Sequence, residues 1–86
     1  MPRGYKVVFA GPRAGPDVHR IRNFAEDLHR ALREKSLGSV PNMDVAYDEV
    51  LVEVDSARHL GPALKAIRAE LARANFDDNV SVERLK

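Results

Sequence analysis

The chain has 86 residues, with 14 Lys and Arg against 13 Asp and Glu, a net charge of +1 and no cysteine. This length predicts one small α/β domain over residues 1–86, and the lack of cysteine excludes disulfides, thiolate zinc sites and thiol nucleophiles. A net charge this close to zero is not typical of a dedicated nucleic-acid-binding protein.

The first predicted element is a strand over residues 5–10. This segment is mostly β-branched or aromatic, and Gly11-Pro12 ends it. Three consecutive apolar residues favour a central strand, and alternation directs Tyr5, Val7 and Phe9 toward the core. The next segment, Gly11–Pro16, holds two glycines and two prolines and therefore predicts a loop.

A long amphipathic helix is predicted over residues 16–36. Pro16 suits its first position, because the missing N–H would have no partner there, and Gly38 is expected to cap its end. Apolar residues recur three or four positions apart along it and form one stripe. The stripe consists of Val18, Ile21, Phe24, Ala25, Leu28, Ala31 and Leu32.

The middle of the chain, residues 39–55, is compatible with either one or two strands. Residues 39–43 are read as a connection, since Pro41 disfavours a central strand. Residues 44–55 then alternate, with valines at 50, 52 and 54 on one face. They exceed the usual strand length of ~5–6 residues, so a break at Asp48-Glu49 would separate a short strand, Met43–Tyr47, from a longer one. Both readings stay open.

The C-terminal part predicts a second helix and a last strand. The helix is expected to run from Pro62 to Asn75, because starting it earlier would place Pro62 inside it. Leu60, Leu64, Ile67 and Leu71 form the apolar stripe of this part of the chain. The last strand is predicted over residues 80–85, with valines at 80 and 82 facing inward.

This order of elements, β-α-β-β-α-β, resembles the ferredoxin-like superfold. The resemblance implies an α+β two-layer sandwich with both helices on one face of the sheet. Without a strand at Met43–Tyr47, the alternative is a three-stranded β-α-β-α-β sheet. Because superfolds host many functions, the resemblance implies no activity.

Two surfaces are candidate sites. The first is an anion site at the Gly11–Pro16 loop and the start of the helix, where backbone N–H groups and basic side chains gather. Its predicted contacts are Arg13, Ala14, Gly15, His19, Arg20 and Arg22. The second is an apolar patch rimmed by charge on the uncovered sheet face, of the kind that marks interfaces. Its predicted residues are Lys6, Val8, Leu51, Glu53, Glu83 and Leu85.

The sequence favours an interaction or regulatory module over an enzyme, because no catalytic constellation appears and the serines lack a nucleophile-elbow context. Three histidines without ligand spacing predict no metal site, and no cofactor is expected. We expect a protein partner or a homodimer that associates through the open sheet face or an edge strand. The alternative is a protein or enzyme that uses the Gly11–Pro16 loop to bind a small anionic ligand such as phosphate, nucleotide or carboxylate. The acidic segment 44–55 suggests a basic target.

The expected location is cytoplasmic, without membrane association. No apolar run approaches the ~20 residues that cross a bilayer, and the first residues lack the apolar stretch of a signal peptide. Binding of RNA or DNA is not expected, since the outward strand residues include two glutamates that would repel phosphate.

Overall fold

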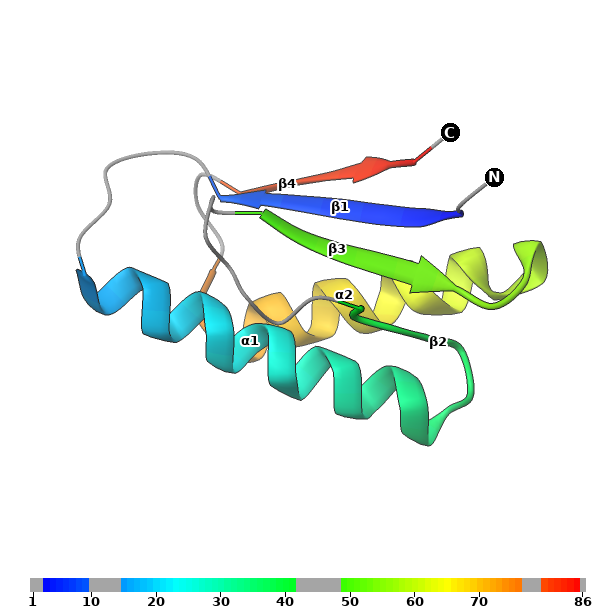
Figure 1. Cartoon of the computed structure of the whole chain (residues 1–86), viewed down its shortest axis with the longest axis horizontal. Helices are drawn as coiled ribbons and strands as arrows, with labels where there is room; N and C mark the ends of the chain where they lie inside the picture. Colours follow the sequence, from blue (N-terminus) through cyan, green and yellow to red (C-terminus); the bar gives the residue numbers. More distant parts are fainter. Residues whose placement is uncertain (1–2, 10–14, 42–48, 77–79, 86) are drawn as a thin grey trace.

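The computed structural model describes residues 3–9, 15–41, 49–76 and 80–85 of the chain (Figure 1). The order of elements is strand β1 (Gly4–Phe9), helix α1 (Gly15–Glu34), strand β2 (Gly38–Ser39), strand β3 (Glu49–Val54), a 3₁₀ turn (Ala57–His59), helix α2 (Leu60–Arg73) and strand β4 (Val80–Arg84). The fold is therefore of the α+β class, as the sequence predicted.

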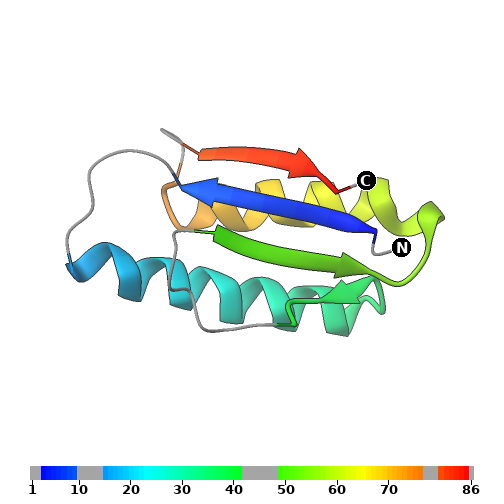
Figure 2. The ribbon, with the colours of Figure 1, turned by 45° about the horizontal axis from the view of Figure 1, so that its top comes forward.

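The strands form one four-stranded sheet in the order β2-β3-β1-β4, and all neighbouring strands run antiparallel. Helices α1 and α2 lie side by side on the same face of this sheet (Figures 1 and 2). The central position predicted for the first strand is confirmed, because β1 lies between β3 and β4. The three-stranded alternative is wrong. In the described ranges, neither helix is long and apolar enough to cross a membrane.

The core lies between the sheet and the two helices, and the predicted inward faces supply it. Tyr5, Val7 and Phe9 are buried on β1, and valines 50, 52 and 54 are buried on β3. The largest completely buried side chains on the helices are Phe24, Ile21, Leu28, Leu32 and Ile67. The Tyr5 hydroxyl donates a 2.7 Å hydrogen bond to the Leu60 carbonyl oxygen. The polar group of this buried side chain therefore has a hydrogen-bond partner.

Both helices end in the same capping arrangement. In α1, the Ser36 and Leu37 N–H groups donate to the carbonyl oxygens of Arg33 and Leu32 at 3.1 and 2.9 Å. In α2, the N–H groups of Asn75 and Phe76 donate in the same pattern to Ala72 and Leu71. This is the Schellman motif, in which the residue after the cap is left-handed and the next is apolar. The left-handed residues are Ser36, with φ 55°, and Asn75, with φ 63°.

Replacement of Ser36 by glycine should stabilise the protein. A residue with a Cβ atom is disfavoured at φ 55°, whereas glycine adopts this conformation at little steric cost. We expect Ser36→Gly to raise the free energy of unfolding by about 0.5–1 kcal/mol, measured by urea denaturation. Glycine at Lys35, the residue before it, is the matched control and should not stabilise. A lower denaturation midpoint for Ser36→Gly would contradict this account of the cap.

Two predicted details are wrong. Gly38 does not cap α1 but begins β2, a short edge strand whose second residue, Ser39, belongs to the predicted connection over residues 39–43. A Cβ atom at Gly38 would lie 2.0 Å from the Glu53 carbonyl oxygen, so the close approach of β3 requires glycine there. Helix α2 begins at Leu60 instead of Pro62. Pro62 still lies in the first turn, where a backbone N–H has no intrahelical acceptor to lose. The strand proposed at Met43–Tyr47 lies outside the described residues.

Candidate functional site

The face of the sheet opposite the helices, here called the open face, carries side chains from β1, β3 and β4. The strand registers arrange these side chains in rows. Lys6 on β1 lies between Leu51 of β3 and Glu83 of β4. In the next row, Val8 lies between Glu49 and Ser81. The predicted members of the patch on β1, β3 and β4 therefore do come together on one surface.

Leu51 is the most exposed large apolar residue of the described chain, at 43%. Val8 is half-buried and lies diagonally across from Leu51 in the β1–β3 register, a distance that side chains can bridge. At the opposite end of the face, Leu85 follows β4, and its N–H donates to the Gly4 carbonyl oxygen at 3.0 Å. The apolar part of the open face is thus small and centred on Val8 and Leu51.

The open face carries more carboxylates than basic groups. Lys6 Nζ lies 3.8 Å from Glu83 Oε1, an exposed ion pair that stabilises the fold little. Glu49 and Glu53 are exposed on β3, and neither forms an ion pair within the described ranges. Lys6 lies in the middle of the open face, and the small apolar part formed by Val8 and Leu51 borders on it. Apolar and charged side chains next to each other are compatible with a non-obligate protein interface, which is about as apolar as the rest of a protein surface.

The predicted anion site is only partly described. Arg13 and Ala14 lie outside the described residues, and Gly15 is the first residue of α1. His19 is exposed on the same helix. Arg22 is also exposed, and its Nε lies 3.8 Å from Glu26 Oε2.

Arg20 contacts the end of the other helix. Its guanidinium donates a 2.8 Å hydrogen bond to the Ala74 carbonyl oxygen. The same group lies 4.4 Å from the centre of the Phe76 ring, within the range of a cation–π interaction. The Ala74 carbonyl lies at the C-terminal end of α2, where a positive charge is favourable. Arg20 therefore links the two helices.

Replacement of Arg20 by alanine should destabilise the protein in the absence of any ligand. Loss of the hydrogen bond to Ala74 and of the contact with Phe76 should lower the free energy of unfolding by about 1–2 kcal/mol. Arg22→Ala, which removes only an exposed ion pair, is the control and should change it by less than about 0.5 kcal/mol. Urea denaturation with and without phosphate measures both. A loss that appears only with phosphate would instead favour the anion site.

The histidines form no cluster in the described structure. His29 accepts a 3.0 Å hydrogen bond at Nδ1 from the Val40 N–H and so fixes the chain after β2. His59 lies at the start of α2, and His19 near the start of α1. No group of three or more His, Cys, Asp or Glu side chains suited to a metal ion occurs among the residues described.

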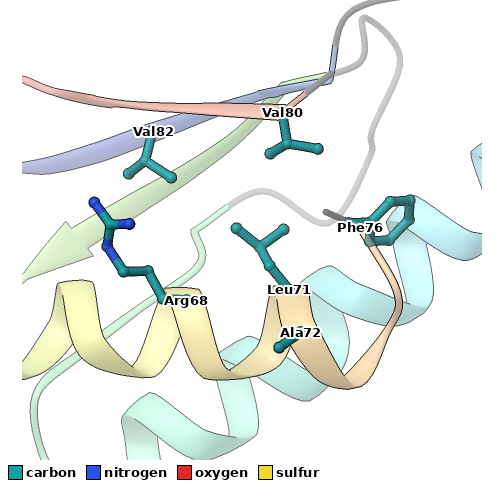
Figure 3. Close-up of a pocket in the computed structure, with 6 residues that line it drawn as sticks. All are labelled: Arg68, Leu71, Ala72, Phe76, Val80 and Val82. Atoms are coloured by element: carbon teal, nitrogen blue, oxygen red, sulfur yellow. The ribbon is translucent and has the colours of Figure 1, made fainter. Parts of the chain in front are cut away.

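No protein-family model, curated protein or solved structure matches the chain. One surface that the sequence analysis did not identify is an apolar groove between α2 and β4 (Figure 3). The inward valines of the last strand were visible in the sequence, but nothing local showed that this strand lies at the edge of the sheet.

Proposed function

We propose that this protein is a non-enzymatic interaction module that forms a homodimer through its open face. The proposal rests on one observation, the exposure of Leu51 at 43% on a sheet face that neither helix covers. An exposed apolar residue is common on its own. Here it has Val8 diagonally beside it and charged residues around it, as in the centre of an interface.

A two-fold axis through the open face would place the same surface on both sides, so each contact would occur twice. Leu51 and Val8 would pack against the same residues of the partner. Rotation of one copy could bring each Lys6 near the partner's Glu49 or Glu53, which form no ion pair in the described monomer. Such a pairing would offset the excess of carboxylates on the face.

The dimer should be weak. Strands ~4.8 Å apart that rise ~3.4 Å per residue give three strands of five or six residues a footprint of roughly 300 Å². A standard interface buries about 800 Å² on each partner. We therefore expect association that depends on protein concentration instead of a permanent dimer.

The proposal includes a ferredoxin-like topology and a cytoplasmic location. The topology is supported by the sheet order, in which β3 separates β1 from β2 and β1 separates β3 from β4. A split arrangement of this kind is the feature of the ferredoxin-like superfold. The cytoplasmic location is inferred from the sequence, whose first residues do not have the pattern of a signal peptide.

The introduction of lysine at Leu51 should abolish self-association without unfolding the protein. A charge in the centre of the interface would lose its hydration on dimerisation, whereas the exposed position tolerates it in the monomer. Sedimentation equilibrium over a range of concentrations should show association for the wild type and a monomer for Leu51→Lys. Ala69→Lys adds the same charge at an exposed position of α2, on the helix side of the sheet, and this variant should still associate. A monomeric wild type at the highest concentration would refute the dimer.

A further inference from the structure

The groove between α2 and β4 has a volume of about 380 Å³. Its apolar walls come from both elements, and the side chains of the two β4 valines point toward the helix (Figure 3). The guanidinium of Arg68 extends from α2 toward Val82 and makes one end of the groove basic. The lining residues are Arg68, Leu71, Ala72, Phe76, Val80 and Val82.

Among the described strands, β4 lies at the edge of the sheet and pairs with β1 alone. The Leu85 N–H donates to Gly4 of β1, and the direction of backbone groups alternates along an antiparallel strand. The backbone N–H and C=O groups of Val80, Val82 and Arg84 therefore point away from β1, toward the unpaired edge. The same alternation directs the side chains of these three residues to the helix side of the sheet.

We propose that this edge and the groove bind an extended segment of a partner protein, which pairs with β4 as a fifth strand. Strand addition of this kind uses backbone hydrogen bonds for affinity and side-chain pockets at alternate positions for specificity. Residues directly opposite each other in a strand pair lie on the same face. The partner residues opposite Val80 and Val82 therefore enter the groove and contact Leu71 and Phe76.

The basic end of the groove selects an acidic segment over a second copy of this chain. Arg68 is exposed and forms no ion pair with any residue that the structure describes. In β4 itself, the residues on the helix side are Val80, Val82 and Arg84, so a second copy pairing through this edge would add an arginine to the groove. The fitting segment carries apolar residues at two alternate positions and a carboxylate at the next.

The test uses the peptide TETVTVT, acetylated and amidated, which places its carboxylate opposite Arg84 and its two valines opposite Val82 and Val80 when it runs antiparallel to β4. Addition of the peptide to ¹⁵N-labelled protein should shift the amide signals of Val80, Val82 and Arg84. Arg68→Glu should weaken binding about tenfold, and the peptide TKTVTVT should recover it with that variant. Lys65→Glu, an exposed charge reversal on α2 outside the groove, should bind the first peptide like the wild type, apart from a small long-range effect.

The outcomes that overturn the proposal are distinct. They are no shift at millimolar peptide, equal binding by wild type and Arg68→Glu, or shifts confined to the open face at Lys6, Val8 and Leu51. Shifts at Val80 and Val82 that depend on protein concentration alone would assign the edge to a second copy. The dispersion of each spectrum shows whether the variant is folded, and Arg68→Gln replaces Arg68→Glu if the reversal unfolds the protein.

Discussion

Gly4→Ala should be the most damaging single-methyl change in the sheet. A Cβ atom at this position would lie 1.8 Å from the Val52 carbonyl oxygen, and Gly4 has a φ of +154°, which L side chains rarely adopt. Gly4 begins the central strand β1, opposite Glu53 of β3, so relief of the clash requires two paired strands to separate. We expect a loss of about 3–5 kcal/mol in the free energy of unfolding.

Gly61→Ala is the matched control for this substitution. It adds the same methyl group in the first turn of α2, where the added Cβ would meet nothing within 4 Å apart from its chain neighbours and the adjacent backbone of the helix. Alanine is the better helix former, so the control should be neutral or stabilising by up to about 1 kcal/mol. Urea denaturation followed by circular dichroism compares the two variants. Equal stability of Gly4→Ala and the wild type would mean that β1 and β3 do not approach each other so closely.

Phe24→Ala should come close to unfolding the protein. Phe24 is 2% exposed and packs edge-to-face against Phe9 and Phe76, with ring centroids 5.6 and 6.0 Å apart. Its loss removes the transfer energy of a buried ring and leaves a cavity between α1, β1 and the end of α2. Such substitutions cost about 3–5 kcal/mol, a large part of the ~5–15 kcal/mol by which most domains are stable.

The conservative variant Phe24→Leu separates the volume of this side chain from its aromatic character. Leucine fills most of the cavity, so we expect a smaller loss, about 1–2 kcal/mol. Thermal denaturation should rank the wild type first, Phe24→Leu second and Phe24→Ala last. If Phe24→Ala melted within a few degrees of the wild type, the cluster with Phe9 and Phe76 would not be part of the stable core.

The sequence predicts the interior of this fold better than the places where distant segments meet. Alternation on β1 and β3 identified the buried faces, because burial in a sheet has a period of two residues. The role of Gly38 differs from the prediction because the carbonyl of Glu53, on another strand, leaves no room for a Cβ atom there. No pattern close to Gly38 in the sequence shows this contact. Both left-handed residues, Ser36 and Asn75, were predicted as the last residues of their helices. The cap of the first helix was nevertheless assigned to Gly38, because serine lacks the preference of glycine and asparagine for this conformation.

In the candidate sites, too, the sequence predicts which residues share a face but not which distant residues they contact. The residues of the open face follow from strand parity once the inward face is known. That Lys6 lies beside Leu51 depends on the strand order and register, which the structure supplies. The basic residues near the start of α1 could be counted in the sequence, but their partners could not. Arg20 binds the carbonyl of Ala74, 54 residues away, and no local pattern encodes that contact.

The position of β1 also determines the order in which the chain can fold. β1 is the first strand of the chain, yet its neighbours β3 and β4 come from the second half, so that Val7 pairs with Val82. During synthesis, β1 and α1 therefore emerge well before either strand that pairs with β1. The chain must lose the conformational entropy of closing these long loops before strand pairing stabilises it. We therefore expect slower folding than for a helical bundle of similar size. Until β4 arrives, one edge of the central strand remains open to pairing with other chains.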